Sequence, residues 1–194
     1  TVTVTNIYEA PVITSNGGGS SVSISYAENG TFAVTNVISE DEDNSSVSPT
    51  WIAQDIATSA DGAFSVYAAD MDGDGDMDIV SASYADDTIA WYENDGNANP
   101  TWTAQNIALS ADGAYSVYAA DMDGDGDMDI VSASWIDDTI AWYENNGNAN
   151  PSWTAQNIAL SADGARSVYA ADMDGDGDMD IVSASNNDDK IAWY

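Results

Sequence analysis

Short runs in which apolar and polar residues alternate recur along most of the chain. Between residues 102 and 145 there are four of them, WTAQNIA at 102–108, SVYAAD at 116–121, MDIVSAS at 128–134 and TIAWYEN at 139–145. The runs are rich in β-branched and aromatic residues and are separated by Gly, Asn, Asp and Pro, as β-strands are. None has the 3.6-residue period of a helix. The pattern predicts four short antiparallel strands.

The four runs belong to a repeat. Near-identical copies cover residues 51–101, 102–152 and 153–194, and each begins with Trp. The first two copies differ at 8 of 51 positions, and the third differs from the second at 4 of 42. Four short strands per repeat are typical of a β-propeller blade, and a solenoid is the alternative. We therefore expect an all-β fold of three four-stranded antiparallel blades that belong to a larger propeller.

The position at which each blade starts within the repeat determines which strands at the two ends of the repeat region are unpaired. If the run at 116–121 is the innermost strand of a blade, the run at 102–108 is the outermost strand of the preceding blade. The run at 51–57 is then an outer strand without a blade, and residues 190–194 end a blade that lacks its outer strand. Such open edges favour self-association. Two solutions are expected for a closed propeller: either the sequence is an excerpt and the remaining blades lie outside it, or two chains of three blades make a ring of six.

Residues 1–50 differ in kind from the repeats. The runs VSISY and FAVTNVI with their Gly and Asn turns predict the strands of a partial β-sandwich-like segment, followed by a linker. AENGT followed by EDED resembles the opening of a bacterial cadherin-like repeat. By that resemblance Glu28, Asp41 and Asp43 hold an inter-domain Ca²⁺, and a solvated acidic linker is the alternative.

The composition is strongly acidic, with 34 Asp and Glu against 2 Lys and Arg and a net charge of -32. This charge argues against nucleic acid and anionic membrane surfaces as partners. The absence of His and Cys excludes Ser-His-Asp and Cys-His catalysis and imidazole zinc sites. The sequence contains no run of about 20 apolar residues, so no membrane-spanning helix is expected. With 44% hydrophobic residues, 7 Trp and 10 Tyr, the chain is expected to pack rather than remain disordered.

Each repeat contains the sequence DMDGDGDMD, which we call the acidic loop. Carboxylates occupy its positions 1, 3, 5, 7 and 9, and glycines at 4 and 6 let the backbone curl so that alternate side chains converge. Oxygen ligands at this spacing suit Ca²⁺, with side chains 1, 3, 5 and 9 binding directly and position 7 through its backbone carbonyl. The predicted metal ligands are Asp70, Asp72, Asp74, Asp76 and Asp78, Asp121, Asp123, Asp125, Asp127 and Asp129, and Asp172, Asp174, Asp176, Asp178 and Asp180.

Charge repulsion supports this interpretation. Five carboxylates within nine residues repel one another unless some are protonated or a cation is bound, so folding of the loop and metal binding are expected to be coupled. The loop is not an EF-hand, because position 12 is Ser81, Ser132 or Ser183 instead of Glu and lies in a predicted strand. A solvated acidic turn without a specific ion is the alternative, which three identical copies disfavour.

The stretch GAYSVYAADMDGDGDMDIVSASWIDDTIAWYENNG closely resembles the FG-GAP/VCBS repeat, the blade unit of integrin-α-like β-propellers. The resemblance covers residues 51–194. It implies a propeller, commonly seven-bladed, with Ca²⁺ in hairpin loops on one face. It also implies that positions 1, 3, 5, 7 and 9 of each acidic loop are the ligands.

These observations favour a calcium-binding, non-enzymatic extracellular or cell-surface module of a large bacterial surface or secreted protein, with a protein or glycan ligand. The alternative is a carbohydrate-binding, lectin-like propeller or an accessory domain of a polysaccharide-active enzyme. Tyr84 and Trp135 lie where the repeats differ and are candidates for stacking on sugars or anchoring a partner, and sequence drift at loop positions is the alternative. A catalytic domain would need a carboxylate pair, and the candidates Glu93 and Glu144 are repeated positions that suggest a structural role.

Overall fold

The computed structural model describes residues 21–22, 37–38 and 51–194. The chain divides into two compact units, Thr1–Ala53 and Gln54–Tyr194, which we describe separately. In the first unit, β1 (Ser21–Val22) and β2 (Val37–Ile38) pair antiparallel. The cadherin-like segment and its candidate ligands Glu28, Asp41 and Asp43 lie outside the described residues.

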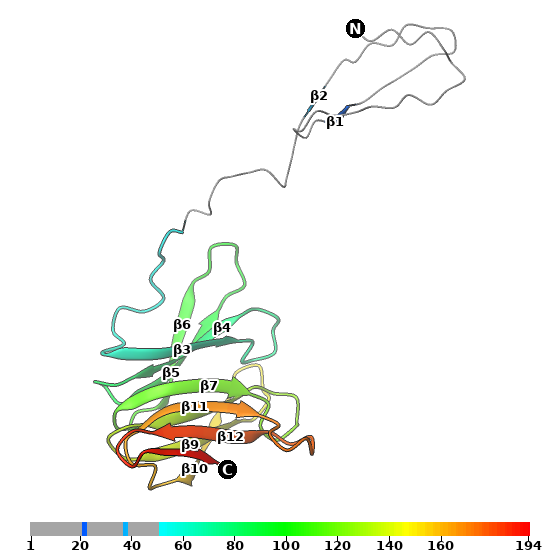
Figure 1. Ribbon diagram of the computed structural model, residues 1–194. Helices are drawn as coiled ribbons and strands as arrows, with labels where there is room; N and C mark the ends of the chain where they lie inside the picture. The colour runs from blue at the N-terminus through cyan, green and yellow to red at the C-terminus, as the bar shows by residue number, and fades with distance from the viewer. Residues whose placement is uncertain (1–20, 23–36, 39–50) are drawn as a thin grey trace, which may run out of the picture. The chain divides into compact units, whose positions relative to one another are not determined.

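The second unit begins with a four-stranded antiparallel sheet in the order β3-β4-β5-β6. Its strands are β3 (Ala63–Ala69), β4 (Asp78–Ser83), β5 (Thr88–Asn94) and β6 (Trp102–Ala108). Consecutive strands are neighbours, so the sheet is a meander built from one continuous stretch of chain (Figure 1).

The next repeat builds the same sheet again. The second sheet consists of β7 (Ala114–Ala120), β8 (Asp129–Ser134), β9 (Thr139–Asn145) and β10 (Trp153–Ala159). The third consists of β11 (Ala165–Ala171), β12 (Asp180–Ser185) and β13 (Lys190–Trp193). The predicted all-β fold of antiparallel blades is confirmed, but the third sheet has three strands instead of four.

Each blade starts and ends where the sequence predicts if the run at 116–121 belongs to the first strand of a blade. The run at 102–108 is the outer strand of the first sheet, whereas the next sheet starts at β7. The matching run at 51–57 forms no strand. Strands need a partner to satisfy their backbone N–H and C=O groups, and within the described ranges no strand pairs with this run.

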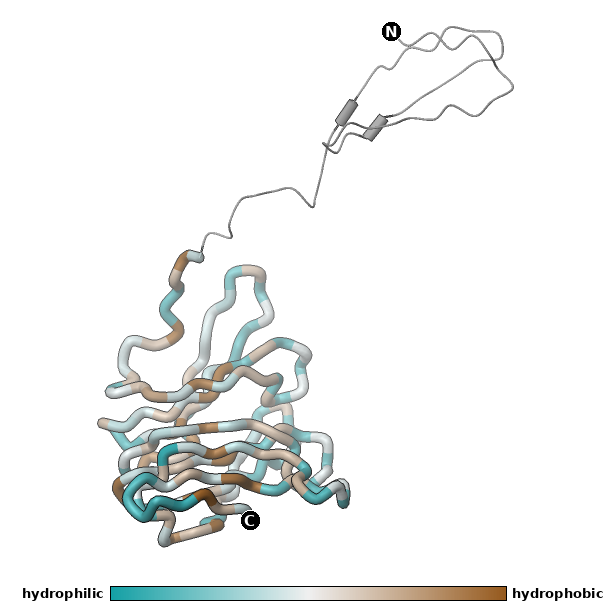
Figure 2. The backbone as a smooth tube through the Cα atoms, in the orientation of Figure 1, coloured by the Kyte–Doolittle hydropathy of each residue, from teal (hydrophilic) through white to brown (hydrophobic). Residues whose placement is uncertain are grey.

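The core lies between successive sheets. Ile89 and Trp91 of the first sheet are fully buried against Val117 and Ile130 of the second. A second cluster joins the second and third sheets in the same way. Alternate residues of a strand point to opposite faces, so the pattern TIAWYEN supplies both faces of a blade. Hydrophilic residues gather in the loops at the strand ends (Figure 2).

Regular structure in the described residues consists of strands. The described residues include no helix with the length and apolar character needed to span a membrane.

Candidate metal centre

The acidic loops connect the first two strands of each sheet. The first loop leaves β3 at Asp70 and enters β4 at Asp78, and the other two occupy the same place in their sheets. The glycines at positions 4 and 6 adopt positive φ angles, 76° at Gly73 and 98° at Gly75. Side chains rarely tolerate this conformation, so the two glycines allow the loop to fold back on itself.

Backbone N–H groups orient the carboxylates inside each loop. In the second loop, Gly124 and Gly126 donate to the two carboxylate oxygens of Asp121 at 2.8 and 3.0 Å. Asp123 Oδ1 accepts from the N–H of Asp125 at 3.2 Å. The same hydrogen bonds recur in the other two loops. Because these hydrogen bonds repeat, they hold the carboxylates in the same arrangement in all three loops.

The last carboxylate of the loop is the most deeply buried. Asp78 and Asp129 are each 1% exposed, at the start of β4 and β8. The Oδ2 atom of Asp129 accepts from the N–H of Met122 at 3.1 Å, and Asp78 accepts from Met71 at the same distance. These hydrogen bonds join the backbone N–H of the second position to the carboxylate of the ninth, and so hold the two ends of the loop together.

Three carboxylates converge in every loop, with one oxygen of each lying within 4.8 Å of the others. Positions 1 and 3 contribute in all three loops, and the third member is at position 9 or position 5. The converging sets are Asp70, Asp72 and Asp78, then Asp121, Asp123 and Asp125, then Asp172, Asp174 and Asp180.

Position 7 behaves differently from the others. A Cβ atom on Gly96 would collide with the carboxylate of Asp76, and one on Gly147 would collide with that of Asp127. The position-7 side chain of the first two loops therefore lies against the turn that follows the third strand, and it belongs to no converging set. This orientation is compatible with a ligand role for its backbone carbonyl, which stays a prediction.

The loop environment penalises negative charge. Burial raises the pKa of Asp129 to about 6, although hydrogen bonds from Asn145 and Met122 oppose the shift. Desolvation and, to a smaller extent, neighbouring carboxylates also raise the pKa of Asp72 and Asp174. A divalent cation among the carboxylates would remove this penalty, so the residues present fit a bound metal ion.

The ligand chemistry is that of a hard cation. Carboxylate oxygens converge, and the sequence has no His or Cys to supply nitrogen or sulfur. Ser81, at the position where an EF-hand carries its bidentate Glu, is buried within β4. The acidic loop is thus a strand-to-strand hairpin loop and lacks the flanking helices of an EF-hand.

Aromatic side chains and one arginine lie close together at the positions where the repeats differ. Phe64 and Tyr115 lie 4.4 Å apart between ring centroids, and Tyr84 lies 5.9 Å from Trp135. The guanidinium of Arg166 lies over both Tyr115 and Trp135 at 5.2 and 5.3 Å. We call these five residues the aromatic cluster. Sequence spacing did not predict it, because its members come from three different sheets.

Comparison with known protein families finds the FG-GAP-like repeat twice in this chain, at residues 70–132 and 129–183. These matches include all three acidic loops. No curated protein matches the chain.

Proposed function

This chain belongs to the FG-GAP-like repeat family, and we propose that it is a calcium-binding, non-enzymatic module of an extracellular or cell-surface protein that binds a protein or glycan ligand. The observation that carries the proposal is the convergence of three carboxylates in each of three identical hairpin loops.

The second loop illustrates the proposed ligand roles. The side chains of Asp121, Asp123, Asp125 and Asp129 would hold the ion, and Asp127 would add its backbone carbonyl. Water would complete the six to eight oxygen ligands that Ca²⁺ takes. A bound ion would supply positive charge where the loop concentrates negative charge. The chain's own contribution is the set of backbone hydrogen bonds that aims the carboxylates inward.

The proposed role of Ca²⁺ is structural. Each loop joins the first strand of a sheet to the second strand, and both strands contribute to the core between sheets. An ion in each loop would stabilise these hairpins in register. Millimolar extracellular calcium saturates even weak sites of this kind, which supports an extracellular or cell-surface location.

Isothermal titration calorimetry tests the calcium proposal. The metal-free chain should bind Ca²⁺ at three sites and bind Mg²⁺ more weakly, because Mg²⁺ is smaller and demands stricter octahedral geometry. A chain that takes up no Ca²⁺ at millimolar concentration would refute the proposal.

Carbohydrate binding is the second candidate function, and the aromatic cluster supports it. Phe64 is exposed, and Tyr84 and Trp135 are partly exposed beside it. Aromatic rings of this kind present apolar surfaces to sugar rings or to a protein partner. A glycan array probed with the chain and with the double variant Tyr84→Ala, Trp135→Ala tests this candidate. If the double variant has unchanged calcium affinity and still binds the same glycans, the result would argue against a role of the aromatic cluster in carbohydrate binding.

An enzymatic role is disfavoured by the repeated placement of the candidate acids. Glu93 pairs with Thr103 and Glu144 with Thr154 in the same register of consecutive sheets. The Nε2 atom of Gln156 also donates to Glu144 at 3.5 Å. We propose that both glutamates serve the sheets, and a polysaccharide hydrolase screen should find no turnover.

A further inference from the structure

Asn145 is a buried asparagine at the end of β9, and its side chain is 2% exposed. Its side-chain nitrogen donates twice, to the carbonyl oxygen of Met128 at 3.1 Å and to that of Met71 at 2.8 Å. Met128 is position 8 of the second acidic loop, whereas Met71 is position 2 of the first. One side chain therefore holds the backbones of two acidic loops in neighbouring blades.

Each end of this connection reaches a carboxylate that is a predicted metal ligand. The backbone N–H of Asn145 donates to Asp129 Oδ1 at 2.7 Å, and the backbone N–H of Met71 donates to Asp78 Oδ2 at 3.1 Å. Asp129 and Asp78 occupy position 9 of the second and the first loop. A path of hydrogen bonds through Asn145 and Met71 therefore joins a ligand of one predicted calcium site to a ligand of the next.

The core between the two blades holds this path in place. Met71 is 1% exposed and belongs to the core cluster that also contains Ile130 and Tyr143 of the second sheet. Ile130 directly follows Asp129 in β8. Because Met71 and Asn145 are both buried, solvent is not available to replace Asn145 as the donor to the Met71 carbonyl. The hydrogen bond between them is therefore costly to break.

An acidic loop has two arrangements whose balance depends on its ion. Without a cation its carboxylates repel one another and favour an open loop, whereas a bound cation favours the closed one. Opening of the first loop moves Met71 away from Asn145 and leaves a buried N–H of Asn145 without an acceptor. Closure of the first loop therefore stabilises the position of Asn145, and with it the hydrogen bond that orients Asp129.

We propose that Asn145 is a positioning residue that couples calcium binding in the first and second acidic loops, so that an ion in one loop raises the affinity of the other. This inference rests on the proposed calcium function and adds a dependence of one site on its neighbour. Linkage requires the effect to be the same in both directions. Its size should be about fivefold, because one hydrogen bond of typical net strength changes an equilibrium constant by that factor.

Charge acts in the opposite direction. An ion in the first loop makes the potential at the second loop less negative and so reduces its attraction for a cation. A test of the hydrogen-bonded path must therefore keep the charge of the first loop constant. The double variant Asp72→Ala, Asp74→Ala does so, because three carboxylates without an ion carry the same charge of -3 as five carboxylates with one Ca²⁺.

The first test is a Ca²⁺ titration followed by two-dimensional NMR, which resolves each loop separately. The amide of Gly126 reports on the second loop because it donates to Asp121, and the amide of Gly75 reports on the first because it donates to Asp70. A global fit of both signals in the unchanged chain gives the affinity of the second loop when the first is filled. That affinity should be about fivefold higher than in the double variant, whose first loop stays empty.

Asn145→Ala should abolish this difference, so that the second loop has one affinity whether the first loop is filled or disabled. The matched control is Asn94→Ala, at the equivalent position of the first repeat. The Asn94 side chain donates to Met77 and accepts from Gly96, and both bonds lie within its own repeat. The fivefold ratio should persist in this control. A ratio that also persists in Asn145→Ala, with both affinities lowered equally, is the result of a merely structural role and would overturn the proposal.

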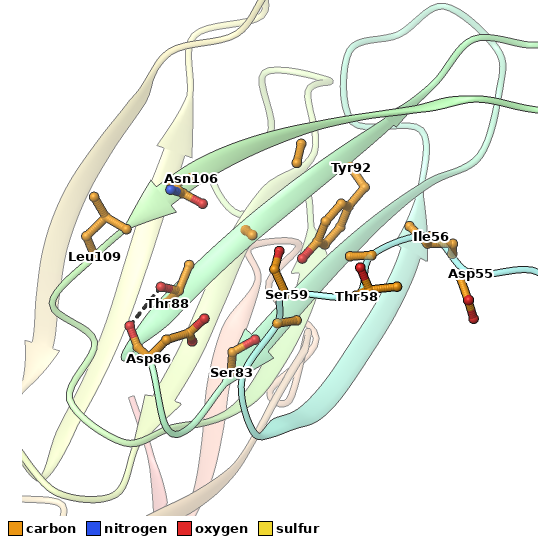
Figure 3. Close-up of a pocket in the computed structure, with 14 residues that line it drawn as sticks. Asp55, Ile56, Thr58, Ser59, Ser83, Asp86, Thr88, Tyr92, Asn106 and Leu109 are labelled. Atoms are coloured by element: carbon orange, nitrogen blue, oxygen red, sulfur yellow. Dashed lines mark hydrogen bonds between the residues drawn. The ribbon is translucent and has the colours of Figure 1, made fainter.

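The pocket on the first sheet provides a reference position away from the path (Figure 3). It lies beside residues 55–60, and Thr88, Ala90 and Tyr92 of β5 are among its lining residues. No residue of an acidic loop lines this pocket. Thr88 lies at the opposite end of β5 from Asn94, whose N–H donates to the first loop. The amide of Thr88 is therefore a reference whose resonance should not move when the first loop fills.

A second measurement keeps Asn145 unchanged, because its replacement also lowers stability. In the Asp123→Ala, Asp125→Ala chain the second loop is disabled while the first can still fill. The side-chain amide resonances of Asn145 should then shift along the same Ca²⁺ titration curve as the amide of Gly75. Asn145 resonances that do not respond, or that shift no more than the reference amide in the pocket, would overturn the path.

Failure of this inference is distinct from failure of the calcium proposal. Coupling changes the affinity of the second loop and leaves the number of ions bound at saturation unchanged. Three sites whose affinities do not depend on one another would overturn the coupling and leave the calcium proposal intact. A chain that takes up no Ca²⁺ at millimolar concentration would overturn both.

Discussion

The Oδ1 atom of Asp129 accepts a hydrogen bond of 2.7 Å from the backbone N–H of Asn145. The side chain of Asn145 in turn donates to the carbonyl oxygen of Met71 at 2.8 Å. Met71 lies in the acidic loop of the first repeat, and its N–H donates to Asp78. A buried asparagine thus connects the acidic loops of two successive blades.

This connection predicts that Asn145→Ala destabilises the fold more than the same change at Asn94. Asn145 is buried, and its loss leaves the buried carbonyl of Met71 without its donor, at a cost of about 1–3 kcal/mol. The matched control Asn94→Ala removes hydrogen bonds to the exposed carbonyl of Met77 and from the N–H of Gly96, both of which Asn145 also makes in its own repeat, but among the described residues it removes no bond to another blade's loop. Urea unfolding in excess Ca²⁺ would measure both. Equal losses of free energy of unfolding would contradict the connection.

Removal of calcium should lower the thermal stability substantially. At a free concentration a hundredfold above the dissociation constant, each bound ion contributes about 2.7 kcal/mol to the free energy of unfolding. Three sites should therefore shift the midpoint by about 10 °C or more, because 1 kcal/mol corresponds to a few degrees for a unit of this size. Circular dichroism melting with Ca²⁺ and with EDTA tests this. An unchanged midpoint would count against calcium in the loops.

Substitutions within one loop should distinguish the side chains that bind Ca²⁺ from a side chain that does not. The double variant Asp72→Ala, Asp74→Ala should bind two Ca²⁺ ions instead of three, because it removes two side chains of the first loop. Asp76→Ala, a matched control in the same loop, should keep three sites, because that carboxylate lies against Gly96. Native mass spectrometry can count the ions. Loss of all three ions in the double variant would show that the blades do not bind independently.

Acid should weaken calcium binding at the second loop. Burial raises the pKa of Asp129 from 3.8 to about 6, so the folded state holds this proton more tightly than the unfolded state. In the metal-free chain, the group's contribution to stability is therefore complete below about pH 4 and is lost as the pH rises through 6. Calcium needs the carboxylate form, so its affinity falls in the opposite direction, as the pH drops through 6.

Calorimetric titrations at pH 5 and pH 7.5 measure this effect. One site should weaken about tenfold at the lower pH, the expected proton competition one unit below a pKa of 6. In Asp129→Asn the pH dependence of that site should be smaller. Affinity that is equal at both pH values would contradict the role given to Asp129.

Local sequence patterns anticipated most of the strands, because alternation and turn residues act over short distances. The runs at 102–108 and 139–145 are strands with those bounds. The run predicted to start at Ser116 begins at Ala114, where a register shift against β8 extends the pairing. Residues 51–57 resemble a strand but form none, because strand formation depends on a pairing partner that sequence similarity does not supply.

The candidate site was anticipated in its residue types but not in its detail. Spacing indicated that alternate carboxylates converge, and positions 1 and 3 do so in every loop. Spacing did not show that the Asp127 side chain lies against Gly147, since that turn is 20 residues further along the chain. The link from Asn145 to Met71 depends in the same way on how the blades pack.

Anomalous diffraction from crystals grown with ample calcium would test the central claim most directly. We predict three calcium peaks per chain, one in each acidic loop, with carboxylate oxygens from positions 1, 3, 5 and 9 around each. Well-ordered acidic loops without a peak would contradict the account.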